Sequence, residues 1–216
     1  MSPSGASGTT LDPDRELTAQ GRERKQQLVD CAATLFAERG YAETRIKDIV
    51  EAAGVAKGLF YWYFENKEAL FTEVAADIRL RLRKHQGAAI DPDDPPLRQI
   101  RTGTEASLRF MADHAPFFSL LEVEAGTEST AARRKGTNQH LRDARRIIEQ
   151  GQAEGTIVDE DPMLLALDVV GPVAYYSHYH RTGRLGVTID ELARYVGASV
   201  VRSLAAHSDH AAAALR

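Results

Sequence analysis

Apolar residues recur every three or four positions from residue 21 onward, which is the spacing of a helix with one buried face. The first part of this pattern predicts four helices, at 21–39, 45–53, 57–64 and 67–86. Gly40 stands where helices commonly end on a glycine, and Gly54-Val55 makes a tight break between two short helices. Two short helices joined by a glycine-containing turn form a helix-turn-helix motif. The sequence therefore predicts this motif at 45–64.

A break at 91–96, rich in Asp and Pro, separates this region from a second helical region. Five further helices are predicted, at 97–114, 117–124, 137–154, 162–181 and 189–206, with a polar loop at 126–136. Thr188 and Glu191 have the spacing of a capping box. Gly171-Pro172 should kink its helix, because proline lacks an N–H group. No strand pattern competes, so the predicted fold is all-α with about nine helices.

These breaks divide the chain into five predicted parts. They are a disordered arm at 1–19, a helix-turn-helix domain at 20–66, a linking helix at 67–90, a second helical domain at 91–208 and a tail at 209–216. The arm is rich in Ser, Gly, Thr and Pro and lacks periodic apolar positions, which is typical of disorder.

A nearly continuous set of residues marks the segment from 36 to 70. It comprises Phe36-Ala37-Glu38-Arg39-Gly40-Tyr41, Ile46-Lys47-Asp48-Ile49, Ala53-Gly54-Val55, Lys57-Gly58, Tyr61, Phe64 and Asn66-Lys67-Glu68-Ala69-Leu70. This set resembles the N-terminal signature of the TetR family of bacterial transcriptional regulators. The resemblance implies a three-helix DNA-binding domain, a fourth helix that links it to a helical effector-binding domain, and a homodimer that binds an operator through two recognition helices.

The resemblance also assigns DNA contacts to individual residues. They are Arg45, Lys47, Lys57, Gly58, Leu59, Tyr61, Trp62, Tyr63 and Lys67. Their chemistry agrees, because lysines neutralise phosphates or donate to guanine, glycine permits close backbone approach, and Tyr and Trp donate to phosphate oxygens. Five consecutive aromatic residues cannot all face inward on a helix, so we assign Phe60 and Phe64 to the core. Core packing of Tyr61 and Trp62 is the alternative.

Two positions depart from the pattern of the resembled family. Arg45 stands where the family usually has Ser or Thr, and Ala56 where it often has Ser, so two side-chain helix caps are absent. Each missing cap costs about 1 kcal/mol, which packing can offset. Thr44 is the available substitute for Arg45 as a cap.

The charge distribution argues against indiscriminate binding to nucleic acid. The net charge is −4, and residues 20–70 carry eight Lys or Arg against eight Asp or Glu. Any DNA contact must therefore be made by a few well-placed cations. The basic run from Arg79 to His85 is better explained as a solvated helix face than as a second DNA patch.

The remaining composition bears on the compartment of the protein. The single cysteine, Cys31, falls on the buried stripe of 21–39, so we interpret it as a core residue. One cysteine forms no internal disulfide, which suits a reducing compartment. Since no signal peptide or long apolar run is present, we expect a cytoplasmic protein that does not enter a membrane.

A ligand cavity is predicted between helices of the second domain, where helical bundles place their ligands. Its candidate lining is Leu108, Met111, Phe117, Phe118, Leu121, Tyr175, Tyr176 and His178. With Asp168 or Arg109 as a source of charge, we expect an apolar or aromatic effector. Plain core packing is the alternative for each lining residue.

The last two long helices carry small and apolar residues suited to helix packing. They are Val169, Val170, Val173, Ala174, Leu192, Val196, Ala198, Ser199, Val200 and Leu204. In the resembled family the corresponding helices form the interface of a homodimer. The alternative is that these residues form only an intramolecular core.

Three classes of function are compatible with the sequence. The first is a ligand-responsive repressor released from its operator by an effector. The second is a helical ligand-binding protein that has lost DNA binding, supported only by the altered caps. The third is a helical enzyme, although the chain has no glycine-rich phosphate loop, nucleophile elbow or HExxH motif. We expect no catalytic residue, no metal and no cofactor.

Overall fold

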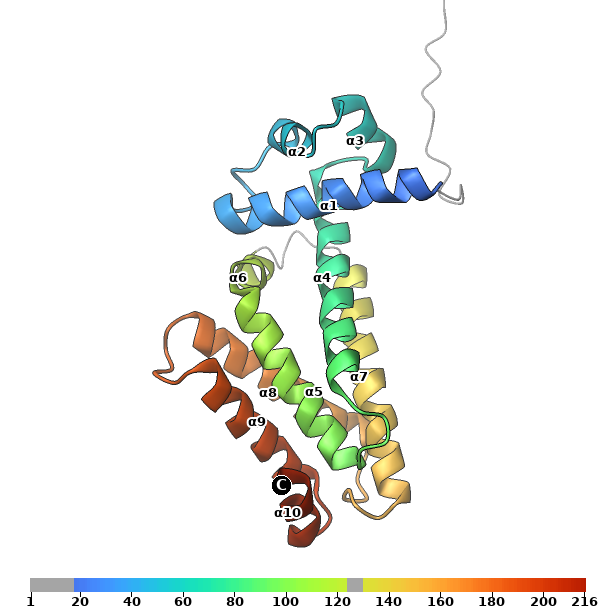
Figure 1. Ribbon diagram of the computed structural model, residues 1–216, viewed down its shortest axis with the longest axis vertical. Helices are drawn as coiled ribbons and strands as arrows, with labels where there is room; N and C mark the ends of the chain where they lie inside the picture. The colour runs from blue at the N-terminus through green and yellow to red at the C-terminus, as the bar shows by residue number, and fades with distance from the viewer. Residues whose placement is uncertain (1–17, 124–129) are drawn as a thin grey trace, which may run out of the picture. The chain divides into compact units, whose positions relative to one another are not determined.

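A computed structural model describes residues 18–123 and 130–216 of the chain, which form ten helices (Figure 1). They are α1 (Ala19–Arg39), α2 (Ile46–Ala52), α3 (Lys57–Tyr63), α4 (Lys67–Ala89), α5 (Pro96–Asp113), α6 (Ala115–Val123), α7 (Thr130–Ala153), α8 (Pro162–Arg181), α9 (Ile189–Leu204) and α10 (Ser208–Leu215). The described ranges contain no strand, apart from an isolated bridge between Ile157 and Ala205. The predicted all-α class is confirmed. Residues 1–17 of the predicted arm lie outside the described residues.

The chain divides into two compact units, one ending at Phe71 and the other beginning at Thr72. We call residues 18–71 the head and residues 72–216 the C-terminal unit. The prediction gave 67–90 to a separate linking helix. The structure instead divides α4 between the two units, so its first turn belongs to the head.

One face of each helix builds the core of the head. The buried apolar residues are Leu28, Val29, Ala32, Leu35, Phe36, Ile49, Val50, Ala53, Phe60, Phe64, Leu70 and Phe71. The assignment of Phe60 and Phe64 to the core is therefore confirmed. Cys31 is half-buried on α1, and burial, with a smaller effect from Asp30, raises the pKa of its thiol. A raised pKa favours the unreactive protonated thiol.

The connection between α1 and α2 is stabilised by hydrogen bonds to its backbone. Gly40 ends α1 with a positive φ of 83°, and its N–H donates to the Phe36 carbonyl. The Thr44 hydroxyl lies 2.8 Å from the Gly40 carbonyl oxygen. The sequence had suggested Thr44 as the cap of α2, but its hydroxyl group bonds to the end of α1 instead. Arg45 holds the N-cap position, and its backbone N–H donates to the Asp48 carboxylate at 3.0 Å.

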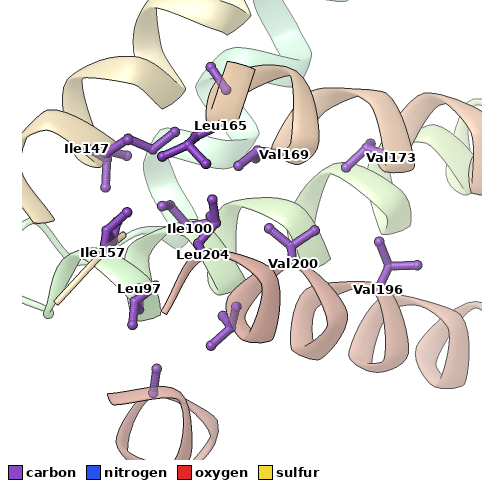
Figure 2. Close-up of a cluster of buried hydrophobic side chains, with 14 of the residues drawn as sticks. Leu97, Ile100, Ile147, Ile157, Leu165, Val169, Val173, Val196, Val200 and Leu204 are labelled. Atoms are coloured by element: carbon purple, nitrogen blue, oxygen red, sulfur yellow. The ribbon is translucent and has the colours of Figure 1, made fainter. Parts of the chain in front are cut away.

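Apolar residues of α5, α7, α8 and α9 form the core of the C-terminal unit (Figure 2). The labelled side chains are Leu97, Ile100, Ile147, Ile157, Leu165, Val169, Val173, Val196, Val200 and Leu204. They occur at helical spacing, so each helix turns one apolar stripe toward its neighbours. α5 packs against α7, α8 and α9 and is thereby the central helix of this unit.

The structure corrects the predicted C-terminal tail, because residues 208–215 form α10. This segment is rich in Ala, the residue with the highest helix propensity. Ala211 and Ala214 are buried, and α10 packs against α5 and α9. This helix could not be predicted from the hydrophobic pattern, because four consecutive alanines show no contrast between an apolar and a polar face.

The start of α7 differs from the prediction, whereas the start of α9 confirms it. α7 begins at Thr130, so residues 130–136 are helical where a polar loop was predicted, and 126–129 lie outside the described residues. The Ala, Arg and Lys residues of this segment favour a helix. At α9 the predicted capping box is confirmed, since the backbone N–H of Thr188 donates to Glu191 at 2.8 Å. Hydrogen bonds from Thr188 lower the pKa of the Glu191 carboxyl.

Candidate nucleic-acid interface and ligand site

The outer face of α3 presents most of the residues predicted to contact DNA. Lys57 and Gly58 are exposed at its first turn, and the side chains of Tyr61 and Trp62 are 47% and 40% exposed. These fractions rule out the alternative in which Tyr61 and Trp62 are core residues. Leu59 is half-buried. α3 therefore buries Phe60 and turns a cationic, small and aromatic surface outward.

Gly58 leaves open space above the α3 backbone. A Cβ atom built at this position meets no atom within 4 Å among the described residues, so the fold does not need glycine here. Glycine in a helix costs roughly 0.5–1 kcal/mol relative to alanine. A glycine that costs stability without relieving a clash fits a surface to which another molecule approaches closely.

Three exposed cations lie on α2, at its start and at the start of α3, and none of them is held firmly. Arg45 is exposed at the start of α2. Lys47 is exposed and lies 3.6 Å from Glu51, an exposed ion pair that contributes little to stability. The Lys57 ammonium lies 5.9 Å from the centroid of the Tyr61 ring. All three side chains can turn toward a phosphate or a base edge at small cost.

Lys67 occupies a different environment from these exposed cations. Its ammonium group donates to the carbonyl oxygens of Tyr41 at 2.7 Å and Thr44 at 2.9 Å. The same group lies 4.2 Å from the centroid of the Tyr41 ring. The Ala42 carbonyl oxygen lies 3.5 Å from the same nitrogen, so each of the three donors of the ammonium group has a carbonyl partner. The structure thus gives Lys67 an intramolecular role, while its phosphate contact stays a prediction.

Tyr63 also makes a contact within the head. Its hydroxyl group donates to the Gly21 carbonyl oxygen at 2.8 Å, which joins the end of α3 to α1. Its ring packs edge-on against Trp62 at 4.6 Å. Tyr63 therefore orients α3 and supports Trp62, and its DNA contact remains a prediction.

The predicted ligand-lining residues fall into separate environments in the C-terminal unit. Leu108 is fully buried in the core, with Met111 packed beside it. Phe117 and Phe118 are buried side chains of α6. Arg109, a proposed source of charge, instead donates to Asp190 at 2.8 Å, and this bond lowers the pKa of the Asp190 carboxyl. These five residues do not line the apolar surface cavity found on α8.

Two of the predicted ligand-lining residues, Tyr175 and Tyr176, line an apolar surface cavity of about 530 Å³ on α8. Its full lining is Gly171, Pro172, Tyr175, Tyr176, Tyr179 and Leu185. Tyr176 also packs edge-on against Tyr195 of α9 at 6.1 Å. This cavity is concave and apolar, as small-molecule sites are.

His178 does not line this cavity, although its ring contacts that of Tyr179, and it belongs to a polar cluster that joins α6 to α8. Its Nδ1 atom lies 2.8 Å from the Glu122 carboxylate, which also accepts a hydrogen bond from Arg181. Glu122 and Arg181 were not predicted as site residues. Their only sequence signal was a cation in the last turn of α8, which is common in helices.

Six of the ten residues predicted for the dimer interface are buried within one protomer. Val169, Val173, Leu192, Val196, Val200 and Leu204 are buried in the core of the C-terminal unit. These six residues support the alternative of an intramolecular core. A different stripe of α8 is exposed and apolar, formed by Leu164, Leu167, Gly171 and Tyr175. Their spacing of three to four residues places them on one helical face.

Two short helices that expose cationic, small and aromatic side chains around a tight turn define a helix-turn-helix DNA-binding protein. Comparison with known sequences agrees with this class. Residues 28–74 match the family described as bacterial regulatory proteins, tetR family. The HTH-type transcriptional repressor DhaR of Mycobacterium sp. (strain GP1) is 30% identical over 147 residues, which cover 66% of this chain and 74% of DhaR. The chain belongs to the TetR family and is a DNA-binding transcriptional regulator.

Two further likenesses extend beyond the head. The probable acrEF/envCD operon repressor of Escherichia coli (strain K12) is 28% identical over 163 residues, covering 69% of this chain and 73% of that protein. The fatty acid degradation regulator FadR from Bacillus halodurans has a similar fold, with a TM-score of 0.74 at 16% identity over 87% of this chain and 97% of that chain. Among the described residues, no helix is long and apolar enough to span a membrane.

The hydrogen bonds of Lys67 predict that its replacement destabilises the head. Lys67→Met should lower the free energy of unfolding by about 1–3 kcal/mol, because the Tyr41 and Thr44 carbonyls lose their donor. Lys57→Met, the matched control on an exposed lysine, should change it by less than about 0.5 kcal/mol. Urea unfolding followed by fluorescence of Trp62, the single tryptophan, measures both. Equal stability of the two variants would contradict the intramolecular role of Lys67.

Proposed function

We propose that the protein is a homodimeric repressor that binds an operator through α3 and is released by a small apolar or aromatic ligand. The observation that carries the proposal is the exposed surface of Lys57, Gly58, Tyr61 and Trp62. α3 would enter the major groove, where Lys57 reaches base edges or a phosphate. Tyr61 and Trp62 would donate to phosphate oxygens beside the groove.

Arg45, Lys47 and Leu59 complete the proposed contact surface. The two cations at α2 would contact the DNA backbone, and Leu59 would meet a thymine methyl group. Tyr63 and Lys67, which are bonded within the head, would act chiefly by fixing α3 and the start of α4. For a phosphate contact, the Lys67 ammonium group would have to exchange one of its bonds to the carbonyl oxygens of Tyr41, Ala42 and Thr44 for a phosphate oxygen.

A dimer would supply the DNA affinity that a single head lacks. Residues 20–70 have equal numbers of basic and acidic side chains, so one head attracts DNA weakly. Two heads at a spacing of about 34–36 Å would bind two half-sites of one operator together. We place the dimer interface on the exposed stripe of α8, Leu164, Leu167, Gly171 and Tyr175, together with Tyr195 of α9.

Ligand control requires a path from the C-terminal unit to the head. In the C-terminal unit, α4 is tied to α7 by the Arg83–Asp143 ion pair at 2.9 Å and to α5 by a bond from Gln86 to Ser107. Because the first turn of α4 belongs to the head, a ligand that moves α5 or α7 would change how the heads are held. By linkage, such a ligand must bind the released state more tightly than the DNA-bound state.

Two other classes of function receive no comparable support. The altered caps at Arg45 and Ala56 were the only argument for lost DNA binding. Asp48 restores a hydrogen bond at the start of α2, whereas Ala56 provides no side-chain cap for α3. For the chain as a whole we propose no catalytic role. As a regulator that acts on the chromosome, the protein would work in the cytoplasm.

The proposed function predicts selective DNA binding that depends on Gly58. Fluorescence anisotropy with duplex DNA from the region beside the gene should show salt-sensitive binding that an unrelated duplex of equal length does not compete away. Gly58→Ala should weaken this binding about tenfold or more, equivalent to about 1.4 kcal/mol, because a methyl group would enter the close approach to DNA. The same substitution should leave the free energy of unfolding equal or raise it by up to about 1 kcal/mol.

Gly87→Ala in α4 is the control for this prediction. Gly87 also lies in a helix, and a Cβ atom there meets nothing within 4 Å among the described residues. Gly87→Ala should keep the operator affinity of the wild type. The proposed function is wrong if the wild type shows no preference between the two duplexes, and the role of Gly58 is wrong if both alanine variants bind equally.

The proposed interface predicts that one charge on α8 separates the protomers. Leu167 is 48% exposed, so Leu167→Glu should leave the fold intact while placing a buried charge in the dimer. Leu80→Glu makes the same change at a 44% exposed leucine of α4 and should remain dimeric. Sedimentation equilibrium measures the mass of each variant. A dimeric Leu167→Glu protein would exclude this stripe as the interface.

A further inference from the structure

The guanidinium group of Arg181 is buried at the end of α8 with part of its donor capacity unused. Its side chain is 2% exposed. Two of its nitrogens donate, one to the Ser177 hydroxyl and one to the Glu122 carboxylate. Its Nε atom has no hydrogen-bond partner among the described residues. The Phe118 ring lies 5.8 Å from the guanidinium carbon and gives the group an apolar floor.

Such a group requires an anion, because an unpaired buried charge is strongly unfavourable. Burial lowers the pKa of Arg181, while the Glu122 carboxylate opposes that effect. Glu122 itself belongs to α6, and its side chain is 42% exposed. Its second oxygen lies 2.8 Å from Nδ1 of His178. The partly exposed Glu122 carboxylate is therefore shared between the Arg181 guanidinium and the His178 ring.

The geometry of the pair leaves a better arrangement available. Arginine binds a carboxylate most strongly when two parallel N–H groups donate to its two oxygens. Glu122 offers only one oxygen to Arg181, and the Nε donor beside it has no partner in the described ranges. A free carboxylate that used both donors would gain a hydrogen bond that Glu122 does not make.

We propose that Arg181 is an anion-binding subsite for an effector that carries a carboxylate, and that Glu122 occupies this subsite until the effector displaces it. The apolar part of the effector would lie against Phe118. This inference rests on the proposed ligand-controlled function and specifies the chemistry of the ligand as an organic acid with an apolar body.

Displacement of Glu122 would change the contact between two helices. The Glu122 carboxylate connects α6 to both His178 and Arg181 of α8. An effector carboxylate on Arg181 would break the second of these bonds and weaken the first. α6 follows α5 directly, and α5 is bonded to α4 through Ser107 and Gln86. The subsite thus lies on the structural route proposed for release.

Octanoate is the probe that tests this subsite, with octanamide as its uncharged match. Glu122→Gln removes the internal competitor and should bind octanoate at least tenfold more tightly than the wild type in isothermal titration calorimetry at fixed ionic strength. Octanamide should bind both proteins equally. The double variant Glu122→Gln with Arg181→Met should lose the gain. Asp190→Asn, which removes one of the two carboxylate partners of the more exposed Arg109 and leaves Glu105, is the matched control and should bind octanoate as the wild type does.

Several results would overturn the subsite. They are an unchanged octanoate affinity in Glu122→Gln, no binding of octanoate to that variant, or equal binding of octanoate and octanamide by it. A second measurement on the wild type covers the case in which Glu122→Gln does not fold. The NMR resonance of the Arg181 Nε–H should shift on addition of octanoate and not of octanamide. An unmoved resonance also overturns the proposal.

Failure of this subsite is distinguishable from failure of the proposed function. Operator binding by the wild type without octanoate tests the regulator alone. Selective operator binding with no response of Arg181 to octanoate would leave the regulator standing and reject the subsite. Octanoate binding at Arg181 without selective DNA binding would support the subsite and reject the proposed regulator.

Discussion

The ammonium group of Lys67 holds together the part of the head on which the DNA-binding surface depends. It binds the carbonyl oxygens of Tyr41 and Thr44, in the connection between α1 and α2, and lies over the Tyr41 ring. That ring packs against Phe71 at 5.0 Å and Phe36 at 5.4 Å. One cation in the first turn of α4 thus fixes the end of α1, the start of α2 and the aromatic core beneath them.

This arrangement separates positioning from contact in the head. The buried Phe60 ring and the hydrogen bond of the Tyr63 hydroxyl hold α3 in place. Lys57, Gly58, Tyr61 and Trp62 remain exposed on its other side. Because the charges of residues 20–70 balance, DNA affinity would come from geometry rather than from a basic surface. Geometry of this kind is sensitive to the spacing of two heads, and spacing is a property that a ligand elsewhere in a dimer can change.

Much of the fold follows from local rules that the sequence displays. The crowded aromatic run predicted that Phe60 and Phe64 face inward, and the structure confirms it. The capping box at Thr188 is equally local, since it depends on two residues three positions apart. α10 escaped prediction because an alanine run lacks amphipathic contrast, although its alanines are buried by tertiary packing.

The candidate sites were harder to predict because partners far apart in the chain decide the role of each side chain. Lys67 matched a family position, but only the fold shows that its donors bind the carbonyls of Tyr41 and Thr44. The valines of α8 have the same helical pattern whether they face their own core or a second protomer. Glu122 and Arg181 are 59 residues apart in sequence, so their pairing had no local signal.

In the proposed function, operator affinity depends on two heads held at a fixed spacing. Fluorescence anisotropy can compare the binding of the wild-type dimer to two duplexes. One is the operator, and the other is the same duplex with an insertion of about five base pairs between its half-sites. Half a turn of DNA places the second half-site on the opposite face of the helix. We expect the insertion to reduce the affinity to the level of a single half-site. Equal affinity for both duplexes would show that the spacing of the two heads does not determine operator binding.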